Sequence, residues 1–253
     1  MHPFGGPVVF FDGDAEDGLS TTTAHEDMDL VRRTLLGLGG GGDGMLRIYR
    51  PVPTAAFSPR DTTMQSYAVA AEAMRKRGFE PVERRAGGQL AIYDRNALVI
   101  DLVAAHPEPR LQFRDRFEGF ASAIAASLAS LSVEARVGCL PGEYCPGDFS
   151  VNGAGRIKLV GVAQRIGRRG YHLGAVISVS PSEPAMAAVA EAYQILGMLF
   201  DPATFGAIAD LVPDLDFGRC ASRCTRPSTG SLLESEAAIL KRPDPVFRPC
   251  VPI

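Results

Sequence analysis

The sequence lacks several features that would point to common classes of protein. It contains no tryptophan, and no apolar run reaches the roughly 20 residues that a helix needs to span a bilayer. Its first residues lack the charged and apolar regions of a signal peptide, so we expect a cytoplasmic protein that is not membrane-bound. The formal charge of -3 shows no excess of basic residues, which argues against nucleic acid as the main partner. Small acidic ligands are not excluded.

Cysteine is scarce and irregularly spaced. The chain has five cysteines, which cannot all pair, and in a chain of this length they are typical of free thiols in a reducing compartment. Cys220 and Cys224 are separated by three residues and have no partnered histidine nearby, so the sequence predicts no metal site. Any chemistry that the cysteines perform is therefore expected to be thiol chemistry.

Strand and helix patterns are mixed along the first 215 residues without strict alternation. Strands are predicted at Val8 to Phe11, Leu46 to Arg50, Arg156 to Ala163 and His172 to Ser180. The order of the elements predicts an α+β fold with a mixed, largely antiparallel sheet flanked by helices. One domain is expected over residues 1–215. Residues 216–253 lose this periodicity and become proline-rich, so we expect a partly irregular or disordered extension.

Local signals mark the ends of several elements. Thr23 to Glu26 has the form of a capping box, and a helix is predicted over Thr62 to Arg77. Another helix is predicted over Phe113 to Leu131. Two more are expected to begin near Ser182, with Pro184 in the first turn, and at Asp201, with Pro202 at the first position. Two β-rich runs between Leu90 and Val103 flank Asp94-Arg95-Asn96, which predicts a hairpin.

The segment around Cys145 carries the strongest chemical signal. Pro146 biases the residue before it toward an extended conformation, and Pro146-Gly147 favours a type II turn. Cys145 is thus expected at an accessible turn, where a nucleophile can be reached, although a cysteine that only packs remains an alternative. Cys139 precedes a second Pro-Gly turn, at Pro141-Gly142, and competes for the same role.

Lys158 interrupts an apolar strand and shares a face with Gln164. Its ammonium either extends to solvent at the end of the strand, or binds a carbonyl, a carboxylate or a phosphate, or lowers the pKa of a nearby thiol. His172, on the next strand, is either a proton shuttle or a packed, hydrogen-bonded histidine.

A loop before the predicted hairpin combines arginine with glycine. Arg84 and Arg85 offer forked donors for an anionic group, while Gly87 and Gly88 allow the backbone to approach a ligand closely. An ordinary solvated turn has the same composition. The loop matches neither the P-loop nor the dinucleotide-binding fingerprint.

Taken in order, these segments resemble the biotin and lipoate protein ligase superfamily, in particular its lipoate ligase and octanoyltransferase branch. LRIYRPVPTAAFSPRD (46–61) is similar to the opening strand pair and its arginine, here Arg60. ERRAGGQLAIYD (83–94) is similar to the motif that lines the acyl and adenylate pocket, and RIKLVGVAQR (156–165) to the strand with the signature lysine, here Lys158. The resemblance implies that residues 1–215 are a catalytic domain.

Within that branch, YCPGDFS (144–150) resembles the active-site region of the amidotransferases that carry the acyl group on cysteine. The resemblance implies transfer of an octanoyl or lipoyl group to a lysine of a lipoyl-domain protein, with Cys145 and Lys158 as catalytic residues. It implies substrate-binding roles for Arg60, Arg84, Arg85, Gly87, Gly88, Gln164 and His172.

This route uses octanoate or lipoate as substrate, no cofactor and no metal, with an acyl carrier or lipoyl-domain protein as donor. One alternative is an ATP-dependent lipoate-protein ligase. Against it, the longer glycine run that such ligases have after the arginine is reduced here to Ala86-Gly87-Gly88-Gln89. A second alternative is a non-catalytic member of the superfamily that binds a ligand or scaffolds a partner.

Overall fold

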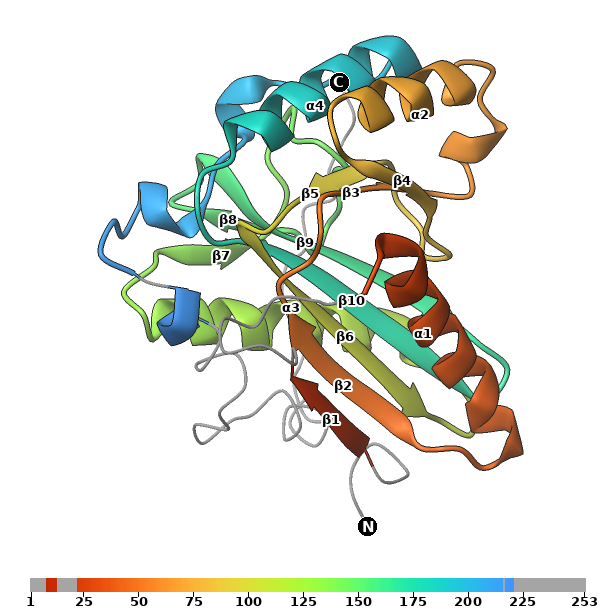
Figure 1. Ribbon diagram of the computed structural model, residues 1–253. Coiled ribbons are helices and arrows are strands. Elements are labelled where there is room, and N and C mark those ends of the chain that lie inside the picture. Colours follow the sequence, from red (N-terminus) through yellow and green to blue (C-terminus); the bar gives the residue numbers. More distant parts are fainter. Residues whose placement is uncertain (1–7, 13–21, 216, 221–253) are drawn as a thin grey trace.

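A seven-stranded sheet forms the body of the protein (Figure 1). The computed structural model describes residues 8–12, 22–215 and 217–220. The strand order is β1 (Val8–Asp12), β2 (Gly44–Tyr49), β6 (Ala97–Ala105), β10 (Gly170–Ser178), β9 (Ile157–Ile166), β8 (Val151–Gly153) and β7 (Ala135–Val137). Among the described strands of this sheet, β1 and β2 pair in parallel and the other neighbouring pairs are antiparallel. The predicted fold class is confirmed, and the strands expected at Arg156 to Ala163 and His172 to Ser180 are present as β9 and β10, which pair antiparallel.

A smaller sheet of three strands has the order β4 (Glu80–Glu83), β3 (Thr54–Phe57) and β5 (Ala91–Tyr93). The predicted hairpin around residues 94–96 is therefore wrong, because β5 lies in the small sheet and β6 in the large one. Asp94 accepts hydrogen bonds from the Asn96 amide and the Ser182 hydroxyl, and its carbonyl accepts from Ala97. This turn carries the chain from one sheet to the other. Likewise β2 and β3, expected as a pair, belong to different sheets.

Two helices pack on the large sheet. Helix α3 (Phe113–Ala129) places Phe120, Ile124 and Leu128 in the main apolar core, which it shares with strands β2, β6, β9 and β10. Helix α1 (Ala24–Gly37) packs against β2, β6 and β10, and its predicted capping box is present at Thr23 and Glu26. Asp27 of α1 and Arg47 of β2 form a buried ion pair at 2.6 Å.

The small sheet is covered by α2 (Tyr67–Lys76) and α4 (Glu183–Leu196), which lie side by side in Figure 1. Their alanine-rich faces enclose a second apolar core with Phe57, Leu90 and Ile92. Ser182 caps α4 as predicted, and Pro184 lies in its first turn.

Two helix predictions need correction. The helix expected from Thr62 begins only at Tyr67, because the chain first forms the 3-10 turn η2 (Asp61–Thr63) and is extended at Met64. Asp201 caps Ala203 as expected, but the element that follows is the 3-10 turn η3 (Pro202–Thr204), after which Phe205 is extended. The other 3-10 turns are η1 (Leu38–Gly40) and η4 (Ile208–Asp210). Within the described ranges no helix is long and apolar enough to cross a membrane.

Candidate active site at the Cys145 turn

Cys145 lies in the connection between β7 and β8, and its side chain is half-buried. The predicted Pro-Gly turn at Pro141-Gly142 is present, with the Glu143 amide bonded to the Leu140 carbonyl and Gly142 at φ 80°. The second predicted turn is wrong. The turn that forms spans Gly147 to Ser150 instead, because the Ser150 amide bonds to the Gly147 carbonyl.

Pro146 predicts an extended backbone at Cys145. The observed backbone is left-handed instead, with φ 43°. Two side chains from distant elements hold it. The Tyr193 hydroxyl of α4 accepts a hydrogen bond from the Cys145 amide at 2.6 Å, and the Lys158 ammonium of β9 donates to the Cys145 carbonyl at 2.8 Å. Left-handed backbone is costly for a residue with a Cβ, and such strain tends to occur at functional sites.

Lys158 does not extend to solvent, since its side chain is 1% exposed. Its ammonium donates to Glu143 Oε1 at 3.1 Å and to the carbonyls of Tyr144 and Cys145 at 2.9 Å and 2.8 Å. An ammonium has three donors, so all of them are used within the turn. Glu143 links the residues of this turn to one another. Its carboxylate also accepts hydrogen bonds from Leu140 N, Gly147 N and Ser150 Oγ.

The Cys145 thiol faces the loop that joins β4 to β5. Its Sγ accepts a hydrogen bond from the Gln89 amide at 3.2 Å and lies 3.6 Å from an amino group of the Arg84 guanidinium. Gly88 permits this approach, since a Cβ there would lie 2.9 Å from the sulfur and 2.8 Å from the Arg84 side chain. The sulfur is therefore contacted by two nitrogen donors, one from a backbone amide and one from a guanidinium.

Arg84 also has a donor to spare. One amino group bonds to the Gln89 carbonyl at 2.7 Å, whereas the buried Nε has no hydrogen-bond partner among the residues that the structure describes. A buried donor without a partner costs free energy, about 1–3 kcal/mol, unless a ligand or water satisfies it. Because an amino group of the same guanidinium lies 3.6 Å from the thiol, Arg84 is a candidate for contact with a substrate oxygen.

Three other predicted residues lie near this centre on exposed surface. The Arg84 amide bonds to the Phe57 carbonyl, which places the ends of β3 and β4 at one edge of the small sheet. Arg85 and Gly87 belong to the loop at this edge, and Arg60 follows β3 at the same edge. All three are exposed.

Gln164 and His172 are not brought to the thiol. Gln164 is six residues beyond Lys158 on β9, about 20 Å along the strand, and its amide bonds to the Phe113 carbonyl at the start of α3. His172 is opposite Arg165 in the sheet and bonds to Asp101 at 2.7 Å. His172 is therefore a packed, hydrogen-bonded histidine, and Gln164 bonds to the start of helix α3.

The other cysteines differ from Cys145. Cys139 is disulfide-bonded, so the expectation of five free thiols is wrong for this residue. Cys220 is fully buried in the core beneath α3, and Cys145 is a free thiol. Cys224 and Cys250 lie outside the described residues. Within the residues that the structure describes, no group of three or more histidine, cysteine or acidic side chains is arranged to hold a metal ion.

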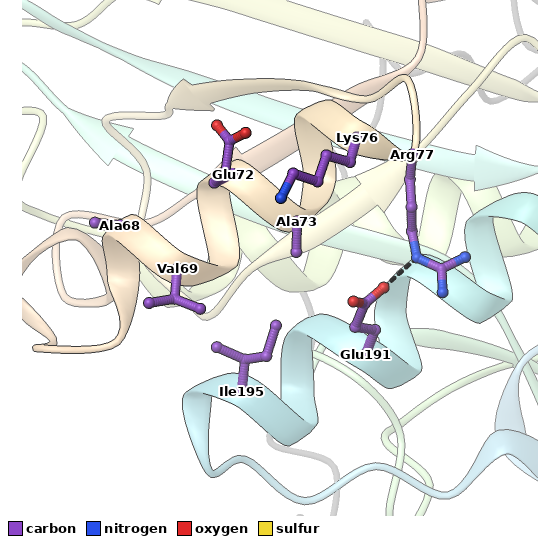
Figure 2. Close-up of a pocket in the computed structure, with 8 residues that line it drawn as sticks. All are labelled: Ala68, Val69, Glu72, Ala73, Lys76, Arg77, Glu191 and Ile195. Carbon is purple, nitrogen blue, oxygen red and sulfur yellow. Dashed lines mark hydrogen bonds and ion pairs between the residues drawn. The ribbon is translucent and has the colours of Figure 1, made fainter.

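A groove of about 640 Å³ lies between α2 and α4, and Figure 2 shows its lining. Val69 and Ile195 form part of its wall, and the Arg77–Glu191 ion pair spans the two helices. On α4, Tyr193 is two residues from Glu191 and therefore points to the opposite side of the helix. The groove is thus separated from the Cys145 turn by α4 itself.

The sequence did not reveal three groups that lie at the site. Glu143 had no signal beyond its place in a Pro-Gly turn, and Gln89 acts through its backbone, which every residue type has. Tyr193 lies on the apolar stripe of α4, where its hydroxyl is the only polar atom among the buried side chains of that helix. A buried tyrosine hydroxyl needs a partner, and this requirement was the one available hint.

The fold and the thiol site place the protein in a recognisable class. The crystal structure of lipoate-protein ligase A bound with ATP shares the fold (TM-score 0.62, 16% identity, covering 93% of this chain and 85% of that one). So does the structure of a bi-partite lipoate protein ligase from Thermoplasma acidophilum (TM-score 0.57, 17% identity, 94% and 84%). The architecture is that of a lipoate ligase catalytic domain.

Residues 24–198 match the family model of the lipoyl protein ligase A/B catalytic domain, and the chain belongs to this family. The resemblance read from the sequence is confirmed. An octanoyl-[GcvH]:protein N-octanoyltransferase of Geobacillus kaustophilus is 27% identical over 174 residues, which cover 69% of this chain and 61% of that protein. A protein of the same name from Exiguobacterium sp. is 26% identical over 145 residues, covering 57% and 51%. The chain thus spans between half and two thirds of the length of these relatives.

Proposed function

We propose that this domain transfers an octanoyl or lipoyl group from a lipoyl-domain protein to a lysine of a second lipoyl-domain protein, through a thioester on Cys145. The observation that carries the proposal is the Cys145 sulfur itself, half-buried and in contact with the Gln89 amide and the Arg84 guanidinium. The names of the curated relatives support octanoyl-[GcvH] as the donor.

The reaction divides into two acyl exchanges. In the first, the Cys145 thiol gives up its proton as its sulfur attacks the carbonyl carbon of the donor's acyl-lysine amide. The C–N bond breaks, the thiol proton goes to the leaving amine, and a thioester remains on the enzyme. In the second, the neutral amine of the acceptor lysine attacks the thioester, the C–S bond breaks, and the amine's proton returns to the thiolate. Neither exchange needs ATP or another cofactor.

Each exchange passes through a tetrahedral intermediate with a negative oxygen. The Gln89 amide donates to the sulfur at rest, and the Arg84 Nε donor is unused. Both groups belong to one loop beside the attacking atom, so they are our candidates for stabilising the oxyanion. Donors fixed in advance at such a position contribute a large part of catalysis in acyl transfer.

Lys158 has a different part in this proposal from the one that the resemblance implies. Its three donors are engaged by Glu143, Tyr144 and Cys145, which leaves none for an acyl carbonyl. We assign it to holding the Cys145 backbone so that the sulfur meets the Arg84 loop. Substitution of Lys158 then acts on the position of the thiol and not directly on the substrate.

The acyl chain has apolar neighbours available. Cys145 packs against the core between the small sheet and α4, which includes Leu90 and Tyr144. Burying an octanoyl chain there contributes about 0.8 kcal/mol for each methylene, enough for a preference between chain lengths.

Replacement of the nucleophile tests the proposal. We expect Cys145→Ala to abolish transfer from an octanoylated lipoyl domain to an acceptor domain, because Cys145 is the free thiol at the site among the residues that the structure describes. Cys220→Ala is the control, since Cys220 lies in the core under α3, and it should retain transfer. Full transfer by Cys145→Ala would refute the thioester route. A requirement for ATP and free lipoate would favour the ligase reaction instead.

A further inference from the structure

A single hydroxyl group joins the two halves of the thiol site. Tyr193 lies in the middle of α4 and is 1% exposed. Its hydroxyl accepts a hydrogen bond from the Cys145 amide at 2.6 Å and donates one to the Leu90 carbonyl at 2.9 Å. Burial raises the pKa of Tyr193 well above its ordinary value of 10, so the hydroxyl keeps the proton that it donates.

The two bonded segments are those that create the sulfur's surroundings. Leu90 directly follows Gln89, whose amide donates to the Cys145 sulfur. The Gln89–Cys145 contact therefore spans two loops that are 56 residues apart in the chain. The Tyr193 hydroxyl connects the same two loops from the side of α4. It does so through Leu90, one residue after Gln89.

Loss of the hydroxyl leaves two backbone groups without their partner. A phenylalanine would keep the ring in its contact with Phe200, at 5.8 Å between centroids, but the Cys145 amide and the Leu90 carbonyl would each lose a hydrogen bond. Pro146 favours extended backbone at Cys145, whereas the observed φ is 43°. Without the Tyr193 bond, the turn can relax toward the extended form, which moves the sulfur away from Gln89 and Arg84.

We propose that Tyr193 is a positioning residue, which holds the Cys145 turn and the Arg84–Leu90 loop in register so that the thiol stays against its donors. The hydroxyl contacts backbone and not the reacting atoms. The proposal rests on the proposed function only where it concerns acyl transfer, because the reactivity of the thiol toward a small alkylating agent can be measured without any acyl substrate.

The experiment compares Tyr193→Phe with Tyr171→Phe in the full chain. Tyr171 is also 1% exposed, but it lies on β10 in the core that faces α3, and it is not part of the thiol site. Iodoacetamide modification of Cys145 is followed at neutral pH by peptide mass spectrometry. The kcat and KM for octanoyl transfer and the midpoint of urea unfolding are measured on the same samples.

We expect Tyr193→Phe to lower both the alkylation rate of Cys145 and kcat by about tenfold or more, the factor that corresponds to one net hydrogen bond of about 1.4 kcal/mol. KM should stay within about twofold, and Tyr171→Phe should keep wild-type alkylation and kcat. Unchanged alkylation in Tyr193→Phe, or an equal loss in Tyr171→Phe, would overturn the proposal. If the wild type transfers no octanoyl group, the proposed function fails, and the alkylation rates still decide the role of Tyr193.

Discussion

Lys158 and Glu143 form an ion pair of 3.1 Å in which both side chains are sealed from solvent, at 1% and 0% exposed. Two charges removed from water are stable only when each is fully bonded. Here the ammonium also binds two carbonyls, and the carboxylate also binds two amides and a hydroxyl. The pair therefore fixes the turn that carries Cys145, and it makes that turn sensitive to the loss of either partner.

Lys158→Met should destabilise the protein by about 3–5 kcal/mol, because it leaves the Glu143 carboxylate buried without a counter-charge. The free energy of unfolding in urea measures the effect. Arg75→Ala is the control, since Arg75 pairs with Glu72 on the exposed face of α2 and its loss should cost no more than about 0.5 kcal/mol. The double variant Lys158→Met/Glu143→Gln should recover part of the stability. A loss no greater than that of Arg75→Ala would contradict the buried pair.

Gly88 tests how closely the Arg84 loop must approach the sulfur. Gly88→Ala should lower octanoyl transfer by about 100-fold, because its Cβ would collide with Cys145 Sγ and the Arg84 guanidinium and displace them. Gly78 is the matched control. It is also left-handed, with φ 81° against 98°, but a Cβ there meets no atom within 4 Å.

Both alanine variants therefore incur the same kind of backbone strain, about 1–2 kcal/mol. Unfolding midpoints of the two variants should shift alike, while steady-state transfer should fall only in Gly88→Ala. Equal transfer by the two variants would show that the tight contact at Gly88 has no part in the reaction.

Asp27 gives a prediction for stability against pH. Burial raises the pKa of this carboxyl above its ordinary value of 3.8, although bonds from Thr22 and Arg47 oppose the shift. The folded state therefore holds the Asp27 proton more tightly than the unfolded state. Its contribution to stability is complete below pH 3.8 and is lost as the pH rises through the folded pKa.

Relative to Asp27→Asn, the wild type should lose stability as the pH is raised from 3.8, measured as the difference in unfolding free energy at a series of pH values. Asp29→Asn, in an exposed pair with Arg32 on the same helix, is the reference for effects of net charge. A wild type that gains stability over Asp27→Asn across this range would refute the sign of the shift.

The sequence predicted the parts of the fold that depend on neighbouring residues. The capping box at Thr23 and the start of α4 at Ser182 follow from side chains that bond to amides three residues away. The strand pair β9 and β10 follows from periodicity and a short connection. Sheet membership was missed for β5 and β6, because a turn at Asp94 looks the same whether the strands that it joins pair together or enter different sheets.

The site likewise has features that the sequence predicted and features that it did not. Residue type and order singled out Cys145, Arg84 and Lys158 in the sequence, although the turn expected at Pro146-Gly147 does not form. The left-handed backbone of Cys145 was not predicted, because the local preference set by Pro146 is overridden by Tyr193, 48 residues away, and by Lys158, 13 residues away. The resemblance implied substrate-binding roles for Gln164 and His172. Gln164, however, lies six positions from Lys158 on β9, at about 3.3 Å per position, and His172 lies opposite Arg165 on the neighbouring strand.

Mass spectrometry of the intact chain shows whether Cys145 carries the acyl group. The protein is incubated without ATP with an octanoylated lipoyl domain, and the modified peptide is then identified. We predict the added mass of one octanoyl group on the peptide that contains Cys145, its removal by neutral hydroxylamine, and its absence in Cys145→Ala. Octanoyl transfer to an acceptor domain that continues undiminished in Cys145→Ala, with no adduct on the wild-type thiol, would contradict the account.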